Sequence, residues 1–227
     1  MAEVLSFNYK TLINNKAKVR LKEFCFHAFT NALDVIRNHN RYFMSETTAY
    51  LFPKKHFEAG EFKAKIETAF GKRKFIDGYY DEDSNWFAAG DNAHLLFDDS
   101  SKEENPPFEY VEIHDTSNKR LLPEGLQEPV ECPFCQADIS EDVNDFLFSI
   151  TEKEYDEKKE TDLAAAELLC PNCAKKSTLS ALTYHERVAF TNQYVCFVAV
   201  LDDINKDTLA EIEREVEAPF EIVYGSI

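Results

Sequence analysis

The chain has 227 residues, of which 44% are hydrophobic and 13% aromatic, and its formal net charge is −17. This composition predicts a folded protein with one large or two small domains rather than a disordered chain. No apolar run reaches the roughly 18 residues of a membrane-spanning helix, and residues 1–10 contain no apolar run typical of a secretion signal. We therefore expect a cytoplasmic protein with reduced thiols and no membrane partner.

Residues 1–97 are predicted to form a mainly helical module. Apolar residues recur at helical spacing over residues 16–37, with no Gly or Pro between them. A second helix is expected over residues 57–70, with Gly71 as its C-cap. The apolar positions are Leu21, Cys25, Ala28, Phe29, Ala32, Leu33 and Ile36 in the first helix, and Phe62, Ile66, Ala69 and Phe70 in the second.

Aromatic residues gather after the second predicted helix, where Tyr79, Tyr80, Trp86 and Phe87 stand among acidic residues. Tryptophan and tyrosine anchor many protein interfaces, so a partner surface is one interpretation. The interpretation we favour is that these residues cap the helical core, because aromatic clusters are more often part of a core.

Residues 98–107 are polar, charged and end in two prolines, which predicts a linker. Beyond it, we expect an acidic α+β domain over residues 108–227. Its first elements are a strand over residues 108–113, a turn over residues 115–118 and a second short strand towards Leu122. The overall fold class is therefore predicted to be α+β.

The C-terminal end of the chain predicts a strand, a helix and a further strand. Residues 194–201 form a continuous apolar run rich in β-branched and aromatic residues. Leu209, Ile212 and Val216 mark a helix that stops before Pro219, and residues 220–224 alternate as a final strand. A unit of this length is expected to place its two strands parallel to each other in one sheet.

Two cysteine pairs, Cys132-Pro-Phe-Cys135 and Cys170-Pro-Asn-Cys173, carry the clearest chemistry. Two residues between thiols allow both sulfur atoms of a tight turn to face one point, and two such turns complete a tetrahedron around Zn²⁺. A completed tetrahedron leaves no position for a substrate. We therefore predict one structural zinc ion per chain. Cys25 and Cys196 lie among apolar neighbours and are interpreted as core residues.

The two pairs resemble the knuckles of the zinc-ribbon class of bacterial and other proteins, in which Cys-Pro-X-Cys turns at the tips of two hairpins share one zinc ion. The resemblance covers residues 130–176 and identifies no specific family. The spacing departs from the pattern, because 34 residues separate Cys135 from Cys170, against roughly 15–20 in compact ribbons. An insertion with a helix over residues 152–169 is expected there.

The residues that follow the knuckles, Gln136 and Ala174, are a second departure from the zinc-ribbon pattern. Glycine is common at this position because the backbone often requires a positive φ. Two other uses of paired cysteines remain less favoured. A thioredoxin-like redox motif needs one pair that opens a helix, and a disulfide scaffold would need more than six cysteines in a chain of this length.

No catalytic motif accompanies the cysteines, so we expect a protein that is not an enzyme. The six histidines lack the His-Glu-X-X-His spacing, and with six glycines there is no glycine-rich phosphate loop. His114, the histidine that most closely precedes the cysteine pairs, does not form the His-X-Glu of zinc deaminases, because it is followed by Asp115 and Thr116.

The charge is divided unevenly along the chain. Residues 1–97 carry 14 Lys/Arg and 12 Asp/Glu, whereas residues 98–227 carry 11 Lys/Arg and 30 Asp/Glu. The acidic part disfavours nucleic acid, since phosphates are bound by lysine and arginine, but it suits a basic protein. The alternative that the charge only maintains solubility stays open.

These observations favour a non-enzymatic, bacterial-type protein-binding module. The leading hypothesis is an immunity or inhibitor protein that neutralises a basic toxin such as a nuclease, because that role needs a shaped acidic surface and no chemistry of its own. The second hypothesis is a zinc-ribbon transcriptional regulator or nucleic-acid-associated factor that binds through its N-terminal helices.

Overall fold

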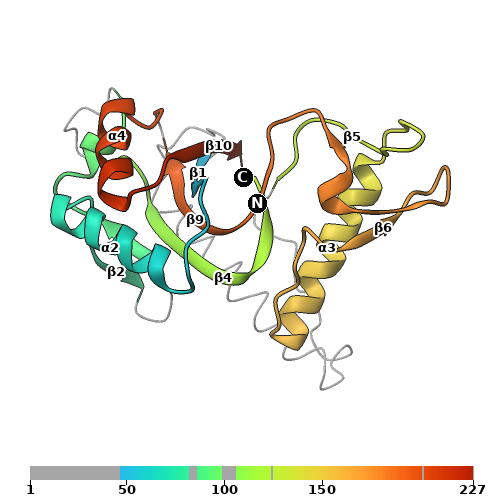
Figure 1. Cartoon of the computed structure of the whole chain (residues 1–227), viewed down its shortest axis with the longest axis horizontal. Coiled ribbons are helices and arrows are strands. Elements are labelled where there is room, and N and C mark those ends of the chain that lie inside the picture. Colours follow the sequence, from blue (N-terminus) through green and yellow to red (C-terminus); the bar gives the residue numbers. More distant parts are fainter. Residues whose placement is uncertain (1–46, 82–85, 99–105, 124, 201, 227) are drawn as a thin grey trace, which may run out of the picture. The chain divides into compact units, whose positions relative to one another are not determined.

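A six-stranded sheet in the order β10-β1-β9-β4-β3-β2 organises most of the fold, and every neighbouring pair in it is antiparallel (Figure 1). The computed structural model describes residues 47–81, 86–98, 106–123, 125–200 and 202–226. The strands are β1 (Thr47–Pro53), β2 (Ile76–Asp81), β3 (Trp86–Ala89), β4 (Tyr110–Leu122), β9 (Ala189–Val200) and β10 (Phe220–Ser226). The described residues therefore have the predicted α+β class.

Two helices, α2 (Glu61–Arg73) and α4 (Lys206–Val216), pack against one face of this sheet (Figure 1). Side chains at alternate strand positions point to the same face, and those facing the helices join them in one core. The core includes Phe62, Ile66 and Phe70 of α2, Ile212 and Val216 of α4, and Leu51, Val111, Ile113, Val195 and Phe197 of the strands. The apolar stripe predicted for the second helix is therefore confirmed.

The prediction of mainly helical structure fails over the described part of residues 47–97. This stretch contributes three strands of the sheet as well as α2 and the short 3₁₀ helix η1 (Ala93–Leu96). The helix also continues past Gly71, and Lys74, with φ of 57°, ends it instead. The helix predicted over residues 16–37 lies outside the described residues, as does most of the predicted linker.

The C-terminal strand, helix and strand are found as predicted. β9 leads through α4 into β10, and both strands pair antiparallel with β1, which lies between them. β9 and β10 are therefore parallel to each other, although they are not neighbours. The side chain of Asn205 caps α4 by accepting a hydrogen bond from the Thr208 amide at 3.0 Å.

β4 differs from the prediction of two strands with a turn between them. Its pairing with β9 runs from Tyr110 to Leu122, and the register shifts between Asp115 and Arg120. The expected turn residues therefore form a bulge within a single strand. A bulge adds residues to one strand without ending the pairing. Its polar residues resemble those of a turn, so the sequence pattern predicts a chain reversal where the structure has a bulge.

Of the four aromatic residues expected to cap a helical core, only Phe87 is buried. Phe87 is buried in the core, but Tyr79 and Tyr80 of β2 are 58% and 49% exposed. Trp86 is partly buried and stacks on Tyr110 at a ring-centroid distance of 4.4 Å. These rings belong to strands at one side of the sheet, not to a helical layer.

A second group of elements surrounds the cysteine pairs and has a core of its own. It contains β5 (Val130–Glu131), α3 (Ser140–Glu157), β6 (Glu167–Leu169), β7 (Lys176–Thr178), η2 (Leu179–Ala181) and β8 (Thr183–Tyr184). The insertion between the knuckles does hold a helix, but it is α3, which begins twelve residues before the predicted start at residue 152. Among the described helices, none has the length and apolar composition needed to cross a membrane.

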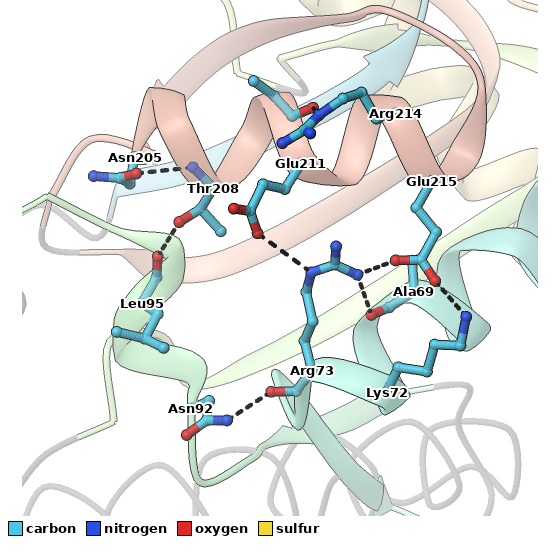
Figure 2. A network of polar contacts seen from close by, with 11 residues as sticks. Ala69, Lys72, Arg73, Asn92, Leu95, Asn205, Thr208, Glu211, Arg214 and Glu215 are labelled. Carbon is cyan, nitrogen blue, oxygen red and sulfur yellow. Dashed lines mark hydrogen bonds and ion pairs between the residues drawn. The ribbon is translucent and has the colours of Figure 1, made fainter.

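Ion pairs tie α2 to α4 at their outer surfaces (Figure 2). Arg73 pairs with Glu215, and Lys72 reaches the other oxygen of the same carboxylate at 2.8 Å. Arg73 also lies 3.9 Å from Glu211. Hydrogen bonds from Lys72 and Arg73 hold the pKa of Glu215 below its ordinary value.

This lowered pKa predicts that acid weakens the contact between the two helices. A carboxylate with a depressed folded-state pKa stabilises the protein above its unfolded pKa, and that contribution is lost as pH falls through the folded pKa. We expect Glu215→Gln to show a smaller loss of stability between pH 5 and pH 2 than the unmodified protein in urea unfolding. Lys72→Met should reduce the pH dependence in the same direction, and equal slopes in all three proteins would contradict the role of this carboxylate.

Candidate metal centre

The four cysteines predicted as ligands lie together at one point of the structure. Their sulfur atoms are all within 4.8 Å of one another. The Sγ atoms of Cys132 and Cys173 are 3.8 Å apart, and those of Cys135 and Cys170 are 3.7 Å apart. A tetrahedral zinc site with Zn–S bonds of about 2.3 Å has roughly 3.8 Å between sulfur atoms. The spacing therefore matches a zinc tetrahedron and is far longer than a disulfide bond.

Each cysteine pair sits on a tight turn with the same hydrogen bonds. In the first knuckle, the Gln136 amide donates to the Cys132 carbonyl at 2.9 Å, and the Cys132 amide donates to the Ala137 carbonyl at 3.0 Å. In the second, the Ala174 amide donates to the Cys170 carbonyl at 2.9 Å. The Cys170 amide donates to the Lys175 carbonyl at 3.0 Å. Two segments far apart in the sequence thus fold into equivalent metal-binding turns.

The residues after the knuckles adopt the backbone conformation that usually calls for glycine. Gln136 has φ of 58° and Ala174 has φ of 53°. A left-handed conformation is unfavourable for residues with a Cβ atom. The knuckle hydrogen bonds nevertheless hold both residues there, so the departure from glycine that the sequence shows does not change the turn.

Short strands hold the two knuckles. β5 leads into the first knuckle, and the bridge between Glu131 and Asp138 closes its hairpin. β6 and β7 form the second hairpin, with Leu169 paired to Lys176 on either side of the knuckle. Both cysteine pairs therefore lie at the tips of short hairpins, and α3 follows directly after the first one.

The electrostatics of the four thiols favour a bound cation. Burial opposes ionisation of Cys132, but hydrogen bonds from the Phe134 and Cys135 amides outweigh it and lower its pKa to about 6. For Cys135, the Ala137 amide lowers the pKa, yet burial and the neighbouring sulfur atoms raise it to about 12. Thiolates this close repel one another, so all four ionise together only when a cation neutralises them.

One side of the cluster is buried and the other reaches the surface. Cys132 and Cys170, the first residue of each pair, are buried in the second core beside Val143 of α3 and Leu179. Cys135 is exposed and Cys173 is partly exposed. Four sulfur ligands complete the coordination of zinc, so the cluster has the chemistry of a structural site rather than an open catalytic one.

Comparison with known proteins adds no assignment. Searches with protein-family models, curated proteins and solved structures found no match to this chain. The interpretation of the cysteine cluster therefore rests on its own geometry. Cys196, predicted as a core residue, is buried in β9, and Cys25 lies outside the described residues.

A hollow of about 610 Å³ is a second feature, and sequence patterns did not indicate it. Segments distant in the chain line it, including the loop before α2, the bulge of β4 and Asp162. Gln193 is buried in its wall and bonds the backbone of Phe57 through its side-chain oxygen at 2.9 Å and its nitrogen at 3.0 Å. The same nitrogen donates to Asp115 at 3.0 Å. These bonds join three segments, which gives Gln193 a structural role.

Proposed function

We propose that this protein is a cytoplasmic, non-enzymatic binding module with one structural zinc ion, and that it neutralises a basic toxin such as a nuclease. The observation that carries the proposal is the combination of a complete set of four sulfur ligands with an acidic surface. Because protein ligands occupy all four coordination positions of the zinc ion, its expected role is to stabilise the fold around it and so the acidic surface of that region. A strong negative field favours fast association with a positive partner.

The charge distribution around the metal centre supports a protein partner rather than nucleic acid. Residues 125–188, which include both knuckles and α3, contain 14 Asp/Glu and 6 Lys/Arg. This surface repels phosphate, and it would complement the positively charged cleft of an enzyme that itself binds nucleic acid.

The second hypothesis, a nucleic-acid-associated factor, depends on lysines of the N-terminal part, and several of these are already engaged. Lys54 pairs with Glu221 at 3.0 Å, Lys65 with Glu217 at 3.1 Å and Lys74 with Asp91 at 3.3 Å. Their carboxylate partners reduce the positive field that phosphate would meet. The described lysines therefore favour the first hypothesis.

Association with a basic protein and with nucleic acid can be separated by two binding measurements. We expect the zinc-loaded protein to form a one-to-one complex with the basic product of a gene beside its own, and the association rate should fall steeply as salt screens the charges. Filter binding to DNA or RNA should show no salt-sensitive retention. Salt-sensitive retention of nucleic acid together with absence of the protein complex would reverse the order of the two hypotheses.

A further inference from the structure

Two aromatic side chains of α3 point into solvent. Phe148 is 65% exposed and Tyr155 is 75% exposed. Within the described residues, neither ring has a ring contact or a side-chain hydrogen bond. Fully burying a side chain of this kind gains roughly 1.5–3 kcal/mol, so two such rings on one helix form a surface that a partner can use.

The helical repeat places both rings on the side of α3 that faces away from its core. Val143 and Ile150 are the buried residues of the helix. Phe148 and Tyr155 each follow one of them by five positions, which is a rotation of roughly 140° around the axis. The two rings are seven residues apart, so they share a face and lie roughly 10 Å from each other along the helix.

Acidic residues surround the two rings on this face. Glu141, Asp145 and Glu152 are exposed and occur at helical spacing with Phe148 and Tyr155. The only basic residue of α3 is Lys153, which lies on a flank of the helix and pairs with Glu157 at 3.9 Å. The face therefore presents aromatic rings and negative charge together, without a basic residue of its own.

The acidic residues in the last turn of α3 do not stabilise the helix. The last turn contains acidic residues and no basic residue, although the C-terminal end of a helix already carries a partial negative charge. Acidic groups at this end are unfavourable by a few tenths to about 1 kcal/mol each. A positively charged partner on this helix would remove that repulsion.

We propose that the outward face of α3, formed by Glu141, Asp145, Phe148, Glu152 and Tyr155, docks an arginine-rich segment of a basic protein. The inference rests on the proposed function and names the surface that performs it. A guanidinium group stacks flat on an aromatic ring and also forms paired hydrogen bonds with a carboxylate, which matches both features of the face. A second copy of this acidic helix, an anionic lipid or a nucleic acid would be repelled.

The test uses a fluorescent nona-arginine peptide as probe and the full zinc-loaded chain, with affinity measured by anisotropy at low and high salt. The double variant Phe148→Ala with Tyr155→Ala should bind the peptide about tenfold more weakly, since each cation–π contact at an exposed site is worth about 0.5–1 kcal/mol. Leu95→Ala removes another exposed apolar side chain and should leave the affinity unchanged. Nona-lysine should lose less affinity than nona-arginine in the double variant.

A second variant separates ring chemistry from apolar area. Phe148→Leu with Tyr155→Leu keeps the helix and much of its apolar surface, and it should lose the preference for arginine over lysine. Unchanged zinc content and circular dichroism show that each variant is folded. Salt-sensitive peptide binding that is equal in all variants would overturn the α3 surface and leave the proposed function standing. Absence of peptide binding at low salt would contradict both the α3 surface and the proposed function.

Discussion

Replacing Cys132 with serine is expected to abolish stoichiometric zinc binding and to unfold the region around the knuckles. Cys132 is one of the two buried ligands of the cluster, and a hydroxyl group is a poor zinc ligand in place of a thiolate. Binding of structural zinc contributes apparent free energies of about 10–16 kcal/mol in zinc-finger peptides. The small second core around α3 cannot replace a contribution of that size.

Zinc content by elemental analysis after dialysis against a chelator measures the first effect. Hydrogen exchange measures the second, and we expect lost protection over β5, β6, β7 and α3 while α2 and α4 stay protected. Cys196→Ala is the matched control, because Cys196 is a buried cysteine of the sheet and not part of the cluster. One zinc ion per chain and unchanged protection in the Cys132 variant would contradict a structural role of the metal.

Phe197→Ala is expected to destabilise the protein by about 3–5 kcal/mol, the usual cost of removing a buried aromatic side chain. Phe197 lies in the centre of the main core, with ring centroids 6.0 Å from Phe70, 5.7 Å from Phe97 and 5.5 Å from Phe108. The substitution therefore removes contacts with a helix and two other segments at once. Since domains are stable by about 5–15 kcal/mol, the loss is a large share of the total.

Urea unfolding followed by fluorescence measures this loss of stability. Leu95→Ala provides the comparison, because Leu95 is half exposed and its replacement should change the free energy of unfolding by less than about 0.5 kcal/mol. Equal urea midpoints for Phe197→Ala and the unmodified protein would show that Phe197 does not lie in a core shared by the sheet, α2 and α4.

The metal centre was predictable because its chemistry is local. Two residues between cysteines define each turn, and four thiols define the metal, so the cluster required no knowledge of the sheet. The backbone at Gln136 and Ala174 shows the limit of residue preferences. Both residues take a positive φ without glycine, since the hydrogen bonds of the knuckle outweigh an intrinsic cost of about 1–2 kcal/mol.

Among the described residues, β9, α2 and α4, which continuous apolar patterns predicted, were confirmed, whereas the late helix of the knuckle insertion, which local composition predicted, was wrong. The apolar runs of β9 and α4 gave the correct order and the parallel relation of β9 and β10. In the knuckle insertion, the alanines near residue 165 favoured a late helix, yet those residues are irregular. The apolar spacing from Val143 to Ile150 marks the real helix, because packing outweighs the small differences in helix propensity.

The sheet contributions of residues 47–97 escaped prediction for a related reason. β1, β2 and β3 are strands of seven, six and four residues, and the helical stripe of α2 dominates the pattern between them. β1 pairs with β10 and β9, and β3 pairs with β4, all from the other half of the sequence, whereas β2 pairs with β3 at the edge of the sheet. Long-range pairing of this kind leaves no periodic signal in a short segment.

The surface of the protein depends on the same long-range arrangement. Lys54, Lys65 and Lys72 each pair with a carboxylate beyond residue 210. Counting charge by halves of the sequence therefore overstates the positive charge that the first half presents to a partner. Around the metal centre, residues 125–188 contain 14 Asp/Glu and 6 Lys/Arg, and α3 alone contributes seven of these acidic residues and one lysine. The zinc ion is therefore proposed to hold in place the surface that binds a partner.

X-ray absorption at the zinc edge of the purified protein tests the closed metal centre most directly. Four sulfur neighbours at about 2.3 Å, with no nitrogen or oxygen neighbour, is the result that the geometry of the four cysteines predicts. A spectrum with fewer than four sulfur atoms and a bound water would show an open position. That result would contradict a structural zinc site and turn the search for function towards catalysis.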